Sequence, residues 1–200
     1  MTTQHQVLEF WFGTLDGEGL ADTEHRQGWW KKDPAFDALI RSRFGELHAA
    51  LHKDEHADWR STAQGALAEI IVLDQFSRNM FRDTDDMFAS DALAQRRCLA
   101  LLEQGFDQSL AVDEKVFAYM PLMHAEDLER QNQCVGLFET LLASLPAGKA
   151  HERIAGNLDF AERHRDIIHD WGRFPHRNAI LDRTSTSEEL AFLETEGSRF

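Results

Sequence analysis

Two short segments, 74–82 and 172–178, each carry an Arg-Asn pair shortly after a phenylalanine. Arginine and asparagine are costly to bury unless their hydrogen bonds are met, so each segment forms either a rigid internal network or the wall of a binding site. Both alternatives stay open at this point. If the segments are two walls of one cleft, the residues available to a ligand are Gln75, Arg78, Asn79, Arg82, Arg173, His176, Arg177 and Asn178.

The first segment continues a buried helical stripe, because Asp74 follows Ile70 by four residues. A lone carboxylate would be expensive there. Arg78 stands four residues further on, the spacing that pairs a carboxylate with a guanidinium on one helix face. An internal Asp74–Arg78 ion pair is therefore the simpler interpretation. Because arginine has five N–H donors, Arg78 can still donate to Asn178, to a backbone carbonyl or to a ligand.

The second segment concentrates positive charge in an acidic chain, with three arginines and one histidine between residues 173 and 183. An anionic ligand such as a carboxylate or a phosphate needs this local reversal of charge. Pro175 and its aromatic neighbours would restrict the mobility of the turn. The alternative interpretation is that these cations clamp helix C-termini or nearby acids, namely Asp166, Asp170 and Asp182.

A third group of polar residues follows Pro121. His124 stands just before a predicted helix, and Glu126 and Asp127 suit the positive end of the dipole of that helix. Capping alone could explain the two acids. The group is nevertheless a candidate third wall of the cleft, which adds His124 and Glu126 to the ligand-binding set.

The catalytic hypothesis concerns two histidines. In this hypothesis His124 and His176 face one another across the cleft, one donating and one accepting protons at neutral pH, while Asp74 or Glu126 fixes the tautomer. The alternative is that a histidine at a helix boundary hydrogen-bonds the backbone. The geometric prediction is that three side chains meet in space: Asn79, His124 and Arg177.

No metal ion or cofactor is expected. His48, His52 and His56 recur at every fourth residue, a spacing at which neighbours can share a metal ion, but the series lies opposite the buried stripe and among charged residues. We interpret it as a solvated helix face. The sequence contains no glycine-rich phosphate loop, no Gly-x-Ser-x-Gly motif and no paired Cys-x-x-Cys motif.

Composition predicts a soluble, cytoplasmic protein with one domain over residues 1–200. Its 35 acidic and 21 basic side chains give a formal charge of −14, which argues against nucleic acid and anionic membranes as partners. The first residues show no secretory signal, and the longest apolar stretch is too short to cross a bilayer. Cys98 and Cys134 are expected to be reduced, packed thiols, although a disulfide between them stays open.

Apolar residues recur at three- and four-residue spacing along most of the chain, which predicts an all-α fold. Asp33 before Pro34 and the Thr186 capping box mark two helix starts. After the first helix, Gly13 and a polar loop through Asp22 are expected. About eight helices in an antiparallel array are predicted: Gln4–Phe12, one from Asp33, one from Ser61, Ser90–Glu103, Asp113–Met120 ended or kinked by Pro121, Glu126–Ser144, Lys149–Asp170, and one from Thr186.

Four separate motifs resemble the bacterial family catalogued as domain of unknown function 924. They are Leu73-Asp74-Gln75-Phe76-x-Arg78-Asn79-x-Phe81-Arg82, Phe88-Ala89-x-Asp91, Tyr119-Met120-Pro121-x-Met123-His124-x-Glu126-Asp127 and Gly172-Arg173-Phe174-Pro175-His176-Arg177-Asn178. The likeness extends from about Val7 to Leu193. It implies a helical fold similar to tetratricopeptide-repeat proteins, and it brings no established activity or catalytic residue.

Three positions depart from the usual family pattern. Ser77 stands where the family usually has proline, Ala125 where it has serine, and Asp182 where it has glycine. A mechanism that needs a serine hydroxyl at position 125 is therefore excluded. Because tetratricopeptide-like arrays often bind peptides on a concave surface, the second hypothesis beside a small anionic ligand is a protein or peptide partner, preferably a basic one.

Overall fold

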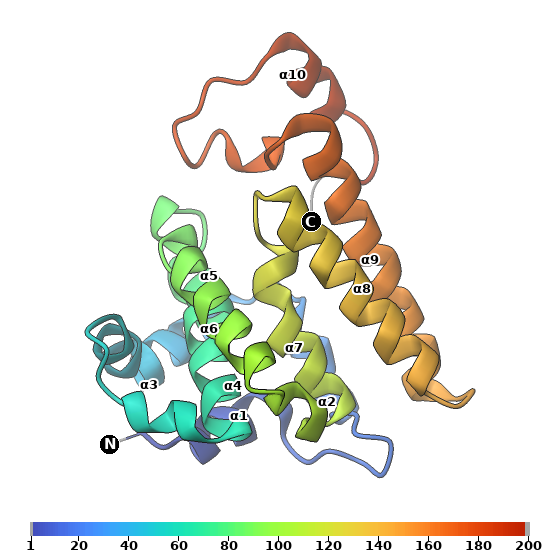
Figure 1. Ribbon diagram of the computed structural model, residues 1–200. Helices are drawn as coiled ribbons and strands as arrows, with labels where there is room; N and C mark the ends of the chain where they lie inside the picture. Colours follow the sequence, from blue (N-terminus) through green and yellow to red (C-terminus); the bar gives the residue numbers. More distant parts are fainter. Residues whose placement is uncertain (1, 199–200) are drawn as a thin grey trace.

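The computed structural model describes residues 2–198, and within that range it contains only helices and connecting loops (Figure 1). The predicted all-α class is confirmed, and the tetratricopeptide-like array is compatible with this architecture. The α-helices are α1 (Gln4–Phe12), α2 (Thr23–Trp29), α3 (Pro34–His52), α4 (Ala63–Ile71), α5 (Ser77–Met80), α6 (Asp91–Glu103), α7 (Val112–Met123), α8 (Leu128–Ser144), α9 (Lys149–Trp171) and α10 (Ser187–Leu193).

A helix surrounded by others forms the centre of the molecule. It runs through α4, a π-helical turn η2 (Val72–Phe76) and α5, and it contacts α1, α3, α6 and α7. Every residue from Gly65 to Ser77 is buried, as expected for a helix that is apolar on nearly all sides. Single π-helical turns inside an α-helix occur frequently at functional sites. Here the π turn contains Asp74 and Gln75 of the first polar segment.

The longest helix pair is the antiparallel hairpin of α8 and α9, which lies beside α7 (Figure 1). Helix α9 ends at Gly172, which has a φ of 68°. Glycine adopts this left-handed conformation without steric cost, so the chain leaves the helix there. The second polar segment then forms a short 3₁₀ helix, η5 (Pro175–Arg177). Residues 172–193, orange to red in Figure 1, lie beyond the ends of both hairpin helices.

The helices differ from the prediction in three places: one additional helix, one helix end and one helix start. Helix α2 was not predicted; it begins where the expected polar loop ends, at Asp22, whose side chain is the N-cap and accepts a hydrogen bond from the backbone N–H of His25. Pro121 does not end α7, which continues to Met123, so proline occupies the last turn of that helix. Helix α8 begins at Leu128 rather than Glu126, because the Asp127 side chain is the N-cap and accepts from the Arg130 N–H.

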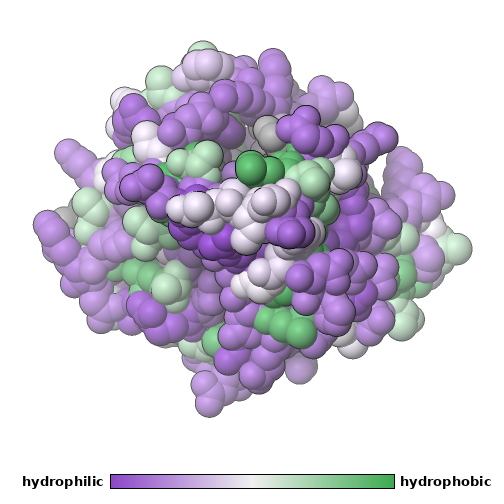
Figure 2. Space-filling view, turned by 90° about the horizontal axis from the view of Figure 1, so that it is seen from above, coloured by the Kyte–Doolittle hydropathy of each residue, from purple (hydrophilic) through white to green (hydrophobic). Residues whose placement is uncertain are grey.

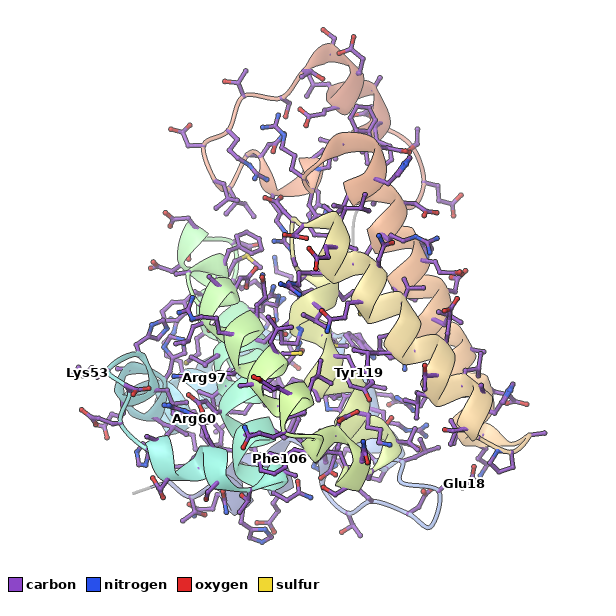
Figure 3. The ribbon with its side chains drawn as sticks, viewed as in Figure 1. Glu18, Lys53, Arg60, Arg97, Phe106 and Tyr119 are labelled. Carbon is purple, nitrogen blue, oxygen red and sulfur yellow. The ribbon has the colours of Figure 1, made fainter. Side chains whose placement is uncertain are left out.

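A buried carboxylate on α4 shows how part of the fold is held together. Both oxygens of Glu69 are paired, one with Nε of Arg60 at 2.9 Å and the other with Nε of Arg97 at 2.7 Å. Asp54 on the surface side contacts both guanidinium groups. Figure 3 labels the two arginines. We refer to these four residues, Asp54, Arg60, Glu69 and Arg97, as the Glu69 clamp.

Two further predictions concern the cysteines and membranes, and the tryptophans complete the description of the core. Cys98 and Cys134 are both free and buried, and burial raises the pKa of each thiol. Trp11, Trp29 and Trp59 belong to the core, whereas Trp30 is 61% exposed. No helix within residues 2–198 combines the length and the apolar character needed to cross a membrane. The face seen in Figure 2 is mostly hydrophilic, with apolar side chains in small separate groups.

Candidate functional site

The two polar segments are joined through one carboxylate. Arg78 donates from Nη1 and Nη2 to the two oxygens of Asp91, at 2.9 and 3.1 Å. Nη1 of Arg78 also lies 3.1 Å from Oδ1 of Asp74, so the predicted Asp74–Arg78 pair is present. Arg177 donates from Nη1 to Oδ2 of the same Asp91 at 3.3 Å. Arg78 from the first segment and Arg177 from the second therefore share Asp91.

Asp91 was not predicted as a site residue. It is the first residue of α6, and thirteen positions separate it from Arg78. Periodicity on one helix could not have paired them. The available signal was its place in the second family motif, where it follows Phe88, a ring that packs against the Arg177 guanidinium.

The third group of polar residues enters the same network through His124. Nδ1 of His124 lies 2.8 Å from Oδ1 of Asp74, and Nε2 of Gln75 donates to Oδ2 of Asp74 at 2.6 Å. Burial by itself would raise the pKa of Asp74, but the charge of Arg78 and the hydrogen bonds from His124 and Gln75 outweigh it. The pKa of Asp74 is therefore held well below its ordinary value, and the group is a carboxylate at neutral pH.

His124 is neutral at the same pH. Burial and the neighbouring Arg78 charge lower its pKa, although Asp74 opposes the shift. Because the Asp74 carboxylate can only accept, the proton of the neutral ring resides on Nδ1, and Nε2 carries a lone pair. The side chain is 16% exposed. Asp74 therefore orients His124, as one form of the catalytic hypothesis requires.

Arg177 is the most unusually placed cation of the site. Its guanidinium carbon lies 4.7 Å from the centre of the Phe88 ring and 4.4 Å from that of Phe174. Nη2 donates to the backbone carbonyl of His124 at 3.1 Å, and Nε is buried without an acceptor among residues 2–198. Burial, reinforced by the Arg78 charge, lowers the pKa of Arg177 to about 10. Arg177 thus remains a cation at neutral pH with hydrogen-bonding capacity to spare.

Asn79 and Arg82 of the first segment do not join this group. Arg82 donates from Nε and Nη2 to the two oxygens of Asp37 in α3, at 2.7 and 2.9 Å. The side-chain amide of Asn79 donates to Asp37 at 2.8 Å. The prediction that Asn79 meets His124 and Arg177 is therefore wrong for Asn79. Its side chain instead helps to attach α5 to α3.

Arg173 and Asn178 belong to a separate clamp. Arg173 donates from Nε and Nη2 to the two oxygens of Glu189 in α10, at 2.6 and 2.7 Å. Asn178 donates to the same carboxylate at 3.3 Å and to Ser185 at 3.0 Å. The alternative interpretation of internal clamps holds for these residues. The partner is Glu189 rather than Asp166, Asp170 or Asp182.

Glu126 also has a structural partner instead of the catalytic role considered for it. Arg183 donates to both of its oxygens, at 2.7 and 2.9 Å, and the backbone N–H of Phe174 donates at 2.7 Å. Burial would raise the pKa of Glu126, but the hydrogen bond from Arg183 and then that from Phe174 lower it. Glu126 therefore connects the loop before α8 to the second segment and does not orient His124.

The imidazole placed beside His124 is that of His164, which was not predicted as a site residue. The two ring centres are 6.5 Å apart. His164 lies on α9, is 6% exposed, and hydrogen-bonds the Phe160 carbonyl through Nδ1 at 2.7 Å. Burial lowers its pKa to about 3. The His176 ring lies 5.5 Å from the Phe174 ring, centre to centre, and is tilted by 39° to it. Its role as an acid or base stays a prediction.

One histidine of α3, His48, is less exposed than expected. Nε2 of His48 lies 2.8 Å from Oγ of Ser77 and 3.1 Å from Oγ of Ser90, both of which are buried. His52 remains exposed, but its Nε2 lies 2.8 Å from the Ser90 oxygen. Burial lowers the pKa of His48 to about 4. The interpretation as a solvated face is wrong for His48, since Ser77 and Ser90 bring it inward.

No group of three or more histidine, cysteine or acidic side chains within residues 2–198 has the geometry of a metal site. The arrangement supports two other kinds of chemistry. A neutral imidazole fixed by a buried carboxylate can accept a proton at Nε2. A guanidinium with an unused Nε–H donor can bind a carboxylate or phosphate oxygen. His124 and Arg177 place these two capacities next to each other.

Comparisons with other proteins give the family and no activity. A family model described as "Bacterial protein of unknown function (DUF924)" matches residues 7–197. A solved structure of a protein of unknown function, ATU0120 from Agrobacterium tumefaciens, is similar over 96% of each chain, with 36% sequence identity and a TM-score of 0.81. No curated protein matches the sequence.

Proposed function

We propose that this chain, which belongs to the DUF924 family of bacterial proteins of unknown function, binds a small anionic molecule beside Arg177 and His124. The observation that carries the proposal is the incomplete pairing of Arg177. Arg82, Arg173 and Arg183 each have two hydrogen bonds to a carboxylate of their own. Arg177 has one long contact to Asp91, which Arg78 already holds with two bonds.

Aromatic packing supports the proposal, because it prepares Arg177 for a planar anion. Phe88 and Phe174 contact the guanidinium of Arg177 and restrict its rotation. A guanidinium held in this way loses little conformational entropy when it binds a carboxylate or a phosphate. The hydroxyl of a phosphate monoester or of a protonated acid could donate to Nε2 of His124.

The test compares two arginines of the same turn. Binding of inorganic phosphate and of acetate is measured by calorimetry for the wild type, Arg177→Gln and the matched control Arg173→Gln. Loss of a charge-assisted hydrogen bond is expected to weaken binding by at least about tenfold in Arg177→Gln. Arg173→Gln should bind as the wild type does, because Arg173 is occupied by Glu189. Equal affinities in all three proteins would reject the site.

A second candidate function is acid–base catalysis on the bound anion, and the Asp74–His124 contact favours it. His124 would accept a proton at Nε2, and Asp74 would stabilise the imidazolium that forms. Asp74→Asn keeps the shape of the side chain and removes the charge. Once a substrate is found, it should lose about a hundredfold in kcat with little change in KM. An unchanged kcat in His124→Gln would exclude this candidate.

We also propose a cytoplasmic location and a basic peptide as a macromolecular partner. A cytoplasmic location is supported by two free, buried thiols, as is usual in reducing compartments. A basic peptide partner is supported by the formal charge of −14. Titration with a lysine-rich peptide at low and high salt tests the second proposal. Binding that does not weaken with salt would contradict it.

A further inference from the structure

A polar cavity of about 320 Å³ lies between the loop after α1, the start of α2 and the start of α9, and it shares no residue with the Arg177 site. Small-molecule sites commonly have roughly 300–1,000 Å³ of space. Three charged side chains line this cavity: Asp16 of the loop, Arg26 of α2 and Lys149, the first residue of α9. Asp16 and Lys149 are exposed and Arg26 is half-buried, so a dissolved molecule can reach all three.

Asp16 is fixed in the loop and has one carboxylate oxygen to spare. Oδ1 accepts the backbone N–H groups of Glu18 and Leu20, at 2.9 and 3.0 Å, and so holds the loop in a turn. Oδ2 has no partner among residues 2–198. The hydrogen bonds from Leu20 and Glu18 lower the pKa of Asp16, and the charges of Lys149 and Arg26 lower it further. Asp16 is therefore a carboxylate at neutral pH, and both cations lie close enough to act on it.

Arg26 is held by atoms of its own helix and cap. Nε donates to the backbone carbonyl of Asp22 at 3.3 Å, and Nη2 donates to Oγ1 of Thr23 at 3.1 Å. Nη1 has no acceptor in the part of the chain that the structure describes. A guanidinium restrained in this way loses little conformational entropy when it binds a carboxylate.

Hydrogen bonds tie the two sides of the cavity together. The backbone N–H of Ala150 donates to Oε2 of Glu18 at 3.1 Å, which attaches the loop to the start of α9. Figure 3 shows Glu18 beside the tip of the α8–α9 hairpin. The backbone N–H of Ala21 donates to the buried carboxylate of Asp113 on α7 at 2.7 Å. These contacts hold the loop, and with it Asp16, in place relative to the first turn of α9.

Opposite charges therefore surround this cavity without being paired. Within residues 2–198, Asp16, Arg26 and Lys149 form no ion pair with one another or with any other side chain. The second acid of the cavity, Asp22, is occupied, because it caps α2 and holds the His25 ring at 2.8 Å. A simple anion would be repelled by the two acids, and a simple cation by the two bases. A molecule that carries one charge of each sign can satisfy all three unpaired groups.

We propose that this cavity binds a free α-amino acid with an uncharged side chain. Its carboxylate accepts hydrogen bonds from Nη1 of Arg26 and Nζ of Lys149, and its ammonium group donates to Oδ2 of Asp16. An uncharged side chain fits because no further unpaired charge lines the cavity among the described residues. The site does not depend on the anion proposed at Arg177.

Nuclear magnetic resonance titrations with three small probes test this proposal. Alanine carries both charged groups, propionate lacks the ammonium group, and ethylammonium lacks the carboxylate. The backbone N–H signals of Ala21 and Thr23 are followed at constant ionic strength. Alanine should shift these signals saturably, and each of the other two probes should bind at least about tenfold more weakly. No saturable shift with alanine, or equal affinities for alanine and propionate, would overturn the proposal.

Two variants and two matched controls assign the charged groups. Asp16→Asn keeps an oxygen for the two N–H groups of the turn and removes the charge, so it should weaken alanine binding about tenfold without weakening propionate binding. Arg26→Gln should weaken alanine binding by a similar factor. Asp159→Asn and Arg96→Gln, at exposed positions on α9 and α6, should bind alanine like the wild type. An unchanged affinity for alanine in Asp16→Asn or Arg26→Gln, or an equal loss for alanine and propionate in Asp16→Asn, would also overturn the proposal.

Discussion

Two buried carboxylates lie five residues apart on the central helix and have different surroundings. Glu69 belongs to a clamp of two acids and two arginines, in which Arg60 and Arg97 each bind Glu69 through Nε and Asp54 through Nη2. Asp74 belongs to a network with the same numbers of acids and arginines: Asp74, Asp91, Arg78 and Arg177. Charge balance alone does not distinguish them.

The two networks differ in whether the Nε–H groups of their arginines have acceptors. In the Glu69 clamp, both oxygens of the buried acid and two nitrogens of each arginine are engaged. In the Asp74 network, Arg177 keeps an unused Nε, and His124 is attached through Nδ1. Because Glu69 occupies Nε of both clamp arginines, we infer that the clamp stabilises the fold, and the unused Nε of Arg177 supports the proposed ligand site.

The largest loss of folding stability is expected when the Glu69 clamp is broken. Glu69→Ala leaves two arginines facing each other without their buried carboxylate, which should cost about 3 kcal/mol of folding free energy. Urea unfolding measures this loss. Glu129→Ala, at an exposed position on α8, is the control and should change stability by less than about 0.5 kcal/mol. A loss for Glu69→Ala as small as that for the control would contradict the structural role.

An intermediate change in stability is expected when the pH is lowered, because of His164 beside the Asp74 network. His164 has an ordinary pKa of 6.5 in the unfolded chain and about 3 in the folded protein. The unfolded state therefore binds more protons below pH 6.5, and stability should fall as the pH decreases from 6.5 toward 3. At pH 5 this proton uptake should lower the free energy of unfolding by roughly 2 kcal/mol relative to neutral pH.

Urea unfolding at pH 7 and pH 5 checks this effect. His164→Gln should reduce the difference between the two pH values, because it removes the proton uptake of the unfolded state. His5→Gln, at an exposed position, should leave the difference as it is in the wild type. A wild-type stability that is equal at both pH values would show that the folded His164 is protonated normally.

A small effect on stability is expected at the site itself. Arg177→Gln removes a cation that has one long contact to a carboxylate, and Asp91 keeps its two bonds to Arg78. Its cost should be about 1 kcal/mol, well below that of Glu69→Ala. Thermal unfolding of both variants makes the comparison. A cost for Arg177→Gln equal to that of Glu69→Ala would place Arg177 among the structural arginines.

The fold was largely predictable because its signals are local. Asp33 before Pro34 and the Thr186 capping box start helices as expected, and Gly172 ends α9. Helix α2 was missed because it is only seven residues long and contains a glycine, so its apolar periodicity is weak. Pro121 is tolerated in the last turn of α7, which local propensity does not reveal.

The candidate site was predictable only where its contacts are local. The Asp74–Arg78 pair follows from a four-residue spacing, whereas Arg177 meets Asp91 across 86 residues and Asp74 meets His124 across 50. The same limitation explains why the partners of Arg82, Arg173 and Arg183 were not identified. Several acids were available to each arginine, and the tertiary packing of distant helices decides between them.

The central claim is that the Nε–H of Arg177 is unused and can serve an anion, whereas the Nε–H of both arginines in the Glu69 clamp is already bound by Glu69. The most direct measurement follows the Nε–H signals of Arg177, Arg60 and Arg97 by nuclear magnetic resonance while inorganic phosphate is added at constant ionic strength. We predict a saturable shift of the Arg177 signal with no change in Arg60 and Arg97. An unchanged Arg177 signal, or equal shifts at all three arginines, would contradict the claim.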